Sequence, residues 1–320
     1  MKAIRVNNFG GPEVLVLEEL PDPKPGPGQV LVRVHAVGVN PVETYLRSGA
    51  NPALPLPYTP GSDAAGEISA LGDSVHGWHV GARVYTSGTV TGAYANLAVC
   101  RATDVHLLPD KVSFAQGAAI NIPCATAWRA LFQRARAVPG ETVLIHGGSG
   151  GVGNAAIPLA RAAGLRVIAT AGTPEGGELV RRLGAHHVFG HHQPDYLKEV
   201  TAITEGRGPD VILELLANVN LSKDLSIIAP RGRIVVIGNR GKIEINPRDA
   251  MMRDAEIHGM LLFNATESEN RAIHAALGAA LENGILNPVI NCELPLSEAA
   301  RAHRQILEPG ARGKIVLLPN

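Results

Sequence analysis

Residues 142–163 read TVLIHGGSGGVGNAAIPLARAA, and this stretch decides the fold. The run TVLI predicts a short buried strand, and the alanine-rich run from Asn154 predicts a helix. Between them, Gly148, Gly150 and Gly153 match the pattern G-x-G-x-x-G. In this pattern the first glycine permits a tight turn, the second lets the backbone approach a pyrophosphate, and the third lets helix and strand pack closely. Because helix-terminal amides then face the phosphates, the stretch predicts dinucleotide binding, with a flexible glycine turn as the alternative.

The chain after this stretch alternates between apolar strands and helices. We expect strands at 166–170, 188–189, 211–213, 233–237 and 257–263, and helices at 178–183, 196–204 and 221–228. Continuous apolar strands separated by helices indicate a parallel sheet that is buried on both faces. Ligands bind such sheets beyond the carboxyl ends of the strands. Gly172 and residues 218–220 and 238–240 are therefore expected near one site, with plain turns as the alternative.

Pro158 conflicts with the helix predicted after the glycine turn. A proline inside a helix removes a hydrogen bond and costs on the order of 3 kcal/mol. We therefore expect either a kink at Pro158 or a helix that begins later.

Residues 1–120 indicate a compact, mostly antiparallel β-rich domain. Residues 29–37 alternate between polar and apolar side chains, and short apolar runs recur at 64–68, 80–85 and 93–99. The exception is 41–47, where Pro41 fits a first helical position after Asn40 as the cap.

The last part of the chain predicts two helices and a strand. The helices are expected at 269–282 and at 297–307, the second with Ser297 as its cap, and the strand at 314–318. This strand has no partner nearby in the sequence, so we expect it to pair with the first domain. The cofactor domain would then be inserted within a discontinuous catalytic domain.

Composition excludes several classes of function. The 320 residues carry 29 Lys and Arg against 29 Asp and Glu, so charge gives no argument for nucleic acid or an anionic membrane as the main partner. No run of about 18 apolar residues predicts a membrane span, and the N-terminus shows no signal-peptide pattern. The scattered Cys100, Cys124 and Cys292 argue against a disulfide framework and indicate a cytoplasmic protein.

Several motifs resemble one known family from end to end. They are GGPEVL at 10–15, GVNPVETY at 38–45, YTPGSD at 58–63, HGGSGGVG at 146–153, LANVNLSKDL at 216–225 and IEINPRD at 243–249. The chain resembles the zinc-free, zeta-crystallin-like quinone oxidoreductases of the medium-chain dehydrogenase/reductase superfamily. One departure is Pro158, where the family usually carries glutamine.

The resemblance implies an α/β fold in which a doubly wound Rossmann sheet is inserted in a GroES-like β-rich catalytic domain. The implied boundaries are 1–120 for the GroES-like domain, 121–260 for the NADP-binding domain and 261–320 for the return to the first domain. The implied cofactor contacts are Tyr45, Ser149, Gly150, Gly151, Val152, Gly172, His191, Asn220, Ile237, Gly238, Asn239, Arg240, Met260, Leu261 and Leu262. The family is usually homo-oligomeric, so we expect a homodimer or homotetramer.

Asn40 and Tyr45 are the candidate catalytic residues. Both lie on the loop that is expected to face the nicotinamide, where either side chain could hold or polarise a carbonyl oxygen. The alternatives are a helix cap for Asn40 and a packing aromatic for Tyr45, with water as the proton donor. Asp63 and Glu43 are interpreted as structural polar residues, and His146 as a core or surface histidine.

No metal is expected. Zinc enzymes of the superfamily place cysteine and histidine ligands in the first domain, but 38–41 and 61–63 offer neither a thiolate nor an imidazole. Without a metal to polarise an alcohol, ordinary alcohol oxidation is disfavoured.

NADPH is the expected cofactor. An NAD site typically presents an acid about 20 residues past the glycine motif, whereas here no acid appears until Glu175. The candidate cations for a 2′-phosphate are His191, with Arg181 or Arg182, and solvated helix charges are the alternative.

The resemblance selects quinones over other electrophiles, so we expect an NADPH-dependent reductase of quinones, with ortho-quinones favoured, that delivers hydride in a cleft between the two domains. An NADPH-dependent reductase of enones or enoyl thioesters is an alternative on the same scaffold. A non-enzymatic role such as RNA binding is a third, although neutral charge and the lack of a basic–aromatic stripe argue against it.

Overall fold

The computed structural model describes residues 1–319 and divides the chain into two compact units. Unit 1 comprises Met1–Ile122 and the residues from Asn287 onward, and unit 2 comprises Pro123–Leu286. The return to unit 1 therefore begins at residue 287 and not at the expected residue 261. The reason is that α9 (Glu267–Glu282) belongs to unit 2, where the buried Arg129 pairs with Glu269 at 3.3 Å.

Unit 1 is built on a mostly antiparallel sheet, as predicted. Its order is β14-β15-β3-β4-β5-β7, with β6 also paired to β3, while β1 and β2 form a separate antiparallel pair. The strands are β1 (Lys2–Val6), β2 (Leu15–Glu19), β3 (Gln29–Gly38), β4 (Ala64–Leu71), β5 (Arg83–Thr86), β6 (Leu97–Arg101), β7 (Val105–Leu107), β14 (Ile290–Pro295) and β15 (Lys314–Leu318). Along β3, Val30, Val32 and Val34 are buried while Arg33 is exposed, which is the alternation that the sequence showed.

Three short α-helices accompany this sheet. They are α1 (Pro41–Arg47), α2 (Phe114–Gly117) and α10 (Ala299–Gln305). The bounds of α1 match the expected helix, and Asn40 is its N-cap residue. The expected cap of the last helix was wrong, because Ser297 lies in a 3₁₀ turn and Glu298 precedes the first residue of α10.

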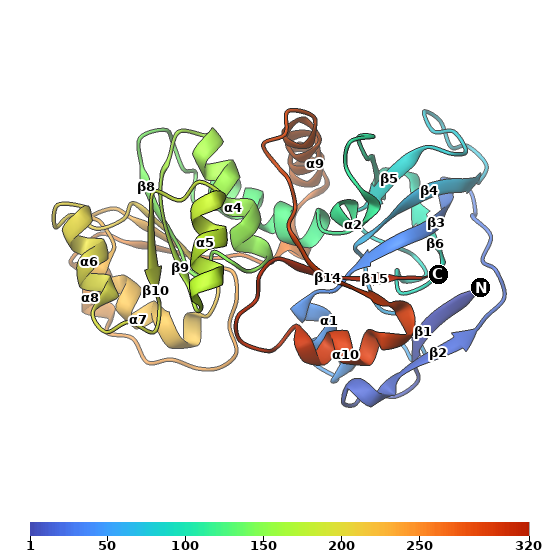
Figure 1. Cartoon of the computed structure of the whole chain (residues 1–320), viewed down its shortest axis with the longest axis horizontal. Coiled ribbons are helices and arrows are strands. Elements are labelled where there is room, and N and C mark those ends of the chain that lie inside the picture. The colour runs from blue at the N-terminus through green and yellow to red at the C-terminus, as the bar shows by residue number, and fades with distance from the viewer. Residues whose placement is uncertain (320) are drawn as a thin grey trace. The chain divides into compact units, whose positions relative to one another are not determined.

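The C-terminal strand returns to unit 1. Val316 and Leu317 of β15 pair antiparallel with Gly38 and Val37 of β3, so the red end of the chain lies beside its blue beginning (Figure 1). This confirms the prediction that the strand at 314–318 joins the first part of the chain.

Unit 2 is a doubly wound parallel sheet, as predicted. Its order is β10-β9-β8-β11-β12-β13, and every neighbouring pair is parallel. The strands are β8 (Thr142–Ile145), β9 (Arg166–Ala171), β10 (His187–Gly190), β11 (Val211–Glu214), β12 (Arg233–Val236) and β13 (Glu256–Gly259). Val143, Leu144 and Ile145 of the central strand are fully buried, because helices cover both faces of such a sheet.

The helices of unit 2 alternate with its strands along the chain (Figure 1). They are α3 (Thr126–Trp128), flanked by π-helical turns at Asn121–Ala125 and Arg129–Arg134, then α4 (Gly151–Ala162), α5 (Pro174–Arg182), α6 (Tyr196–Ile203), α7 (Ala217–Ile227), α8 (Pro247–Met251) and α9. The expected late helix start was wrong, since α4 begins at Gly151 and continues through Pro158. Buried neighbours such as Ala156, Ile157 and Ala160 anchor the helix around the missing amide.

No helix within residues 1–319 combines the length and the apolar character that crossing a membrane requires.

Candidate functional site

The glycine-rich turn sits between the end of β8 and the start of α4, where its backbone is firmly anchored. Gly148 N–H donates to the Thr170 carbonyl at 2.7 Å, and Asn154 Nδ2 donates to the carbonyl of Ser149 at 2.6 Å. A Cβ on Gly153 would lie 2.5 Å from the Cα of Gly148, so only glycine permits this approach. The first amides of α4 lack partners within the helix and are suited to bind an anion.

The other expected cofactor residues of unit 2 lie just beyond the carboxyl ends of its strands. Gly172 follows β9, His191 follows β10, residues 237–240 follow β12 and residues 260–262 follow β13, whereas Asn220 lies in the first turns of α7 after β11. This is the edge at which parallel sheets of this type bind ligands. The structure thus brings these residues to the same edge as the glycine-rich turn.

Two neighbouring loops at this edge are held together by backbone contacts. Ala217 N–H donates to the Gly238 carbonyl at 2.9 Å, and Arg240 N–H donates to Asn218 Oδ1 at 2.9 Å. A Cβ on Gly238 would collide with the Leu215 carbonyl, so glycine is required there. The loop after β12 is consequently fixed against the first turn of α7.

A cavity of about 400 Å³ opens beside the ends of β9 and β10. It is lined by Ala171, Gly172, Thr173, Pro174, Gly177, Glu178, Arg181, Val188, Phe189, Gly190, His192 and Gln193. β9 ends at Ala171, and Thr173 caps α5 by accepting from Gly176 N–H at 3.1 Å, so residues 171–174 at this strand end carry no carboxylate of the kind that an NAD site presents. Among the charged side chains of the lining, Arg181 supplies a cation and Glu178 an anion.

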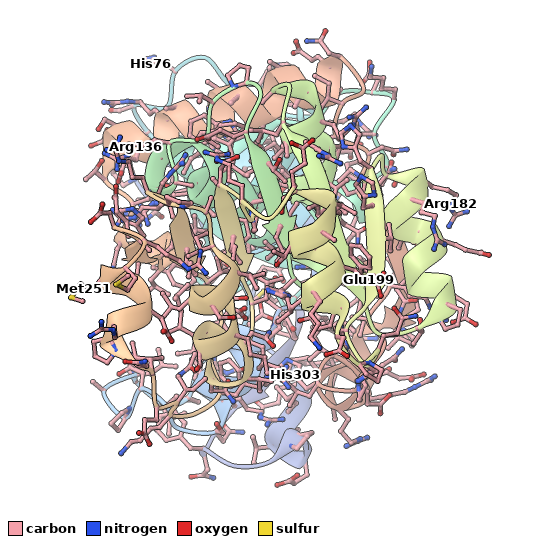
Figure 2. All side chains as sticks on the ribbon, turned by 90° about the vertical axis from the view of Figure 1, so that its left-hand side faces the viewer. His76, Arg136, Arg182, Glu199, Met251 and His303 are labelled. Atoms are coloured by element: carbon pink, nitrogen blue, oxygen red, sulfur yellow. The ribbon has the colours of Figure 1, made fainter. Side chains whose placement is uncertain are left out.

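The residues expected to bind a 2′-phosphate, His191, Arg181 and Arg182, differ in their position relative to this cavity. His191 lies against Gly172, and burial followed by the neighbouring His192 lowers the pKa of His191, which leaves its ring neutral near pH 7. Arg182 is exposed and extends away from α5 into solvent (Figure 2). His192 lines the cavity but was missed, because nothing in the sequence distinguishes it from its neighbour.

Asn40 lies in unit 1 within a buried polar network. Its Nδ2 faces Gly38 O, Glu43 Oε1 and Asp63 Oδ2, the last at 3.0 Å, and its Oδ1 accepts from the Lys314 ammonium. Both ends of the amide are therefore engaged within the protein. The geometry favours the helix-cap alternative for Asn40, because Glu43 also accepts from the Asn40 N–H at 2.9 Å, and leaves its catalytic role a prediction.

Asp63 is a second centre of this network. Its carboxylate accepts from Lys314 Nζ at 3.2 Å and from Asn121 Nδ2 at 2.9 Å, and its side chain is fully buried. The expectation that Asp63 is a structural residue agrees with these contacts. No local pattern could identify Lys314 as its partner, since the two residues lie 251 positions apart.

Glu43 forms the other arm of the network with Tyr94 and His303. Tyr94 Oη donates to Glu43 Oε2 at 2.6 Å and lies 3.1 Å from His303 Nε2. Burial, partly offset by the Tyr94 hydrogen bond, raises the pKa of Glu43 to about 7. Burial lowers the pKa of His303 to about 3, so its ring is neutral and a proton on Nε2 completes the chain of donors.

Tyr45 is the accessible member of the predicted catalytic pair. It lies on α1, two residues after Glu43, and is 37% exposed. The Tyr45 ring is therefore available to a ligand, whereas Glu43 on the buried side of α1 belongs to the polar network.

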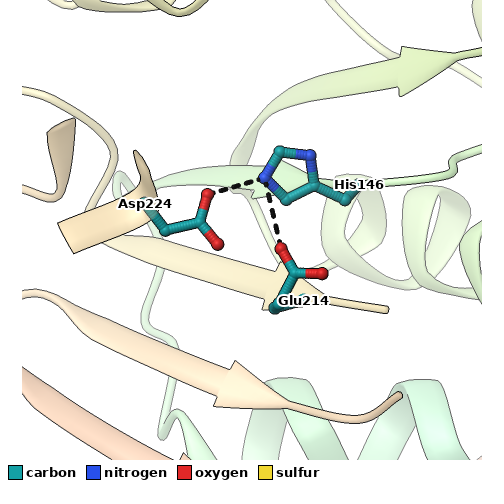
Figure 3. Close-up of side chains that lie close together, drawn as sticks. All are labelled: His146, Glu214 and Asp224. Atoms are coloured by element: carbon teal, nitrogen blue, oxygen red, sulfur yellow. Dashed lines mark hydrogen bonds and ion pairs between the residues drawn. The ribbon is translucent and has the colours of Figure 1, made fainter. Parts of the chain in front are cut away.

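His146, Glu214 and Asp224 form a buried cluster in unit 2, directly before the glycine-rich turn (Figure 3). His146 Nε2 lies 2.8 Å from Asp224 Oδ1, which is a hydrogen-bonding distance between the two groups. His146 is a core residue, one of the two alternatives expected for it. Reasoning from sequence missed the two acids, because only the fold shows that residues 146, 214 and 224 meet.

Comparisons with known proteins support this description. A family described as "Alcohol dehydrogenase GroES-like domain" matches residues 26–110, and one described as "Zinc-binding dehydrogenase" matches residues 151–277. A quinone oxidoreductase of Homo sapiens is 51% identical over 99% of this chain and 98% of its own length. A 2-haloacrylate reductase of a Burkholderia species is 32% identical over 98% of each chain.

The likeness extends to a solved structure. The Escherichia coli quinone oxidoreductase in complex with NADPH superimposes with a TM-score of 0.89 over all of both chains, at 27% sequence identity. The end-to-end identity to the human protein shows that this chain belongs to the quinone oxidoreductase family of the medium-chain dehydrogenase/reductase superfamily.

Proposed function

We propose that this chain is an NADPH-dependent quinone reductase. The observation that carries the proposal is the 51% identity to a quinone oxidoreductase over 99% of the chain. The carboxyl edge of the sheet in unit 2 fits the cofactor, because it offers an anchored glycine-rich turn and, beside β9, a cavity that holds Arg181. The residues from the end of β9 to the start of α5, 171–174, present no carboxylate that would repel a 2′-phosphate.

Different residues of unit 2 would bind different parts of the cofactor. The amides of Gly150, Gly151 and Val152 would hold the pyrophosphate at the start of α4, and Arg181 would meet the 2′-phosphate. The contacts carried over from the family at 237–240 and 260–262 would continue along the same sheet edge. Bound there, reduced nicotinamide supplies the hydride.

The residues of unit 1 orient the quinone and stabilise charge. A quinone is already electron-poor, so a hydrogen bond to its oxygen is enough to stabilise the developing oxyanion. The Tyr45 hydroxyl is accessible for that bond, with the proton then supplied by water. Asn40 holds α1 in place through Glu43, and thus acts as a positioning residue for Tyr45.

We propose that this chemistry needs no bound metal. The buried cation at Asn40 and Asp63 is the Lys314 ammonium. An ammonium donates hydrogen bonds to both residues but offers no Lewis-acid site for an alcohol.

Ortho-quinones are the proposed substrates, and a substrate panel tests this. Initial rates of NADPH oxidation are compared for 1,2-naphthoquinone, 9,10-phenanthrenequinone, a para-quinone, an enone and a 2-haloacrylate. The account expects the highest kcat/KM for the ortho-quinones. Reduction of activated C=C bonds is the second candidate, favoured by the 32% identity to a 2-haloacrylate reductase, and faster turnover of the enone or haloacrylate would support it.

We also propose that the chain works as a homo-oligomer in the cytoplasm. Strand β13 is an edge of the sheet in unit 2, and its Ile257, together with Leu261 and Phe263 just beyond it, is exposed. An exposed apolar edge strand is suited to pair with a second copy of the chain. Sedimentation velocity of the wild type and of Ile257→Lys tests this, and a monomeric wild type would contradict it. The free thiols of Cys100 and Cys292 support a reducing compartment.

A further inference from the structure

Glu214 connects the end of β11 to the first turn of α7. Its Oε1 accepts from the Leu216 N–H, two residues further along the chain, and from Asn220 Nδ2 at 3.3 Å. Asn220 is one of the cofactor contacts carried over from the family. One carboxyl oxygen therefore sets the position of a cofactor residue.

The opposite oxygen of Glu214 points into the buried cluster with His146 and Asp224 (Figure 3). Glu214 Oε2 lies 3.6 Å from His146 Nε2, and the nearer acid, Asp224, takes the hydrogen bond of that ring at 2.8 Å. The side chains of both acids are completely buried. One imidazolium balances only one carboxylate, so a second buried negative charge would be left without a counterion.

Each of the two acids also leaves one oxygen without a hydrogen bond. Among the described residues, Glu214 Oε2 and Asp224 Oδ2 have no hydrogen bond to a donor. Oxygens of the two acids lie within 4.8 Å of each other and of the His146 ring nitrogen. A single proton held between the two carboxyl groups satisfies both oxygens and removes the surplus charge. His146 in turn is followed directly by the glycine-rich turn, so the proton completes a continuous connection from that turn to Asn220.

We propose that Glu214 is a positioning residue of the cofactor site: a proton that it shares with Asp224 joins the glycine-rich turn to the first turn of α7, and NADPH binding requires that proton. The proposal rests on the proposed NADPH-dependent function. The step is a simple acid dissociation, in which the proton of the shared pair passes to water and leaves two carboxylates.

The surrounding charges agree with a neutral Glu214. Burial, followed by the effects of Asp224, raises the pKa of Glu214 to about 8 even though His146 opposes the shift. Burial lowers the pKa of His146, but Asp224 and Glu214 outweigh it and the net direction is upward. With a protonated His146 ring and one proton shared by the two acids, the cluster carries no net charge.

Other titratable groups face the cluster from the elements packed around it. They are Lys223 on α7, Tyr196 on α6 and His191 after β10. The two acids raise the pKa of Tyr196 to about 12, after the larger effect of burial, so Tyr196 stays neutral when Glu214 ionises. Loss of the shared proton then places two carboxylates side by side and loosens the hold on Leu216 and Asn220.

The test is the dissociation constant of NADPH, measured by fluorescence titration between about pH 6 and pH 9.5. The wild-type constant is expected to be level near neutrality and, above about pH 8, to rise toward tenfold per pH unit, the slope for one linked proton. Glu214→Gln replaces the acid by an amide that donates to Asp224 at every pH, so its curve is expected to stay flat. Asp224→Asn removes the second carboxylate and is expected to abolish the rise as well.

Glu199→Gln is the matched control, because Glu199 is an exposed acid on α6 of the same unit (Figure 2). Its curve is expected to follow the wild type. A flat wild-type curve, or a Glu214→Gln curve that keeps the alkaline rise, would overturn the proposal. Because binding is measured without quinone, that failure leaves quinone reduction standing, whereas a protein that binds no NADPH at any pH contradicts the proposed function itself.

The kinetic readout separates positioning from stability. Across the same pH range the KM for NADPH of the wild type is expected to rise while kcat at saturating NADPH stays level. Circular dichroism measures the fraction of folded protein over the same pH range. If kcat falls in parallel with that fraction, Glu214 has a merely structural role and the assignment is overturned.

Discussion

The Lys314 ammonium donates to Asp63 Oδ2 at 3.2 Å, and the two side chains are 5% and 0% exposed. This contact joins the first residue of β15 to the residue before β4, 251 positions away in the sequence. A second hydrogen bond from the same ammonium reaches Asn40 Oδ1. The C-terminal strand thereby supplies the charge that balances the polar residues beneath α1.

Replacing Lys314 by methionine leaves the Asp63 carboxylate buried without its cation. Removing one partner of a buried ion pair destabilises a protein by about 3–5 kcal/mol. Lys314→Met is therefore expected to lower the midpoint of urea denaturation strongly. Lys198→Met is the control, since Lys198 and Asp195 are 79% and 65% exposed and an exposed pair contributes about 0–1 kcal/mol. Equal midpoints for the two variants would contradict this view of Lys314.

The contribution of the Tyr94 hydroxyl to the free energy of unfolding is expected to increase as the pH rises. Burial raises the pKa of Glu43 to about 7. The stabilisation that the protonated Glu43 contributes is therefore fully present below the ordinary carboxyl pKa and is lost as the pH rises through about 7. Tyr94→Phe removes a donor to this carboxyl, and an ionised buried acceptor loses more than a neutral one. The loss of unfolding free energy is expected to be about 1 kcal/mol near pH 5 and roughly 2–3 kcal/mol near pH 9.

Urea denaturation at the two pH values measures this difference. Tyr58→Phe is the matched control, because the buried Tyr58 hydroxyl has no hydrogen-bond partner among residues 1–319. Its effect is expected to be small at both pH values. A Tyr94→Phe effect that is independent of pH would show that Glu43 does not ionise in this range.

Arg181 is expected to discriminate between the two nicotinamide cofactors. It lines the cavity beside the end of β9, where a 2′-phosphate would meet it. Arg181→Ala is expected to raise the KM for NADPH about tenfold, because a charge-assisted hydrogen bond contributes roughly 1.5–3 kcal/mol, and to leave the KM for NADH nearly unchanged. Arg182→Ala is the control, since Arg182 extends into solvent (Figure 2). Equal effects on both cofactors would reject this role.

Tyr45→Phe separates polarisation from proton donation. With water as the proton source, the variant is expected to keep a measurable kcat within about a hundredfold of the wild type and to show a higher KM for the quinone. Initial-rate kinetics over a range of quinone concentrations give both constants. A fall of kcat by about a thousandfold or more would instead identify Tyr45 as the general acid.

Local patterns predicted most of the fold. The glycine-rich turn, the alternation along β3 and the cap at Asn40 depend on neighbours within a few residues, and each formed where the sequence indicated. Pro158 led to the wrong expectation of a later helix start, because proline has a low helix propensity. Buried neighbours such as Ile157 nevertheless hold this segment in the helix. Tertiary packing overrides a local preference of this size.

The candidate site was less predictable because its polar partners come from distant segments. Asn40 and Tyr45 were proposed from a local motif, and their catalytic roles stay predictions. Lys314 and His303 reach the polar network of Asn40 and Glu43 from the C-terminal part of the chain. Likewise, Glu214 and Asp224 look like ordinary acids at a strand end and in a helix. Only the order of the strands shows that both meet His146.

The most direct test of the central claim is a single-turnover experiment with the full chain. Protein saturated with NADPH is mixed with 1,2-naphthoquinone in a stopped-flow instrument, and the loss of NADPH absorbance is followed. The account predicts rapid oxidation with the quinone, faster with NADPH than with NADH at equal concentration. No oxidation with 1,2-naphthoquinone or 9,10-phenanthrenequinone, together with rapid oxidation by an enone or a 2-haloacrylate, would contradict it.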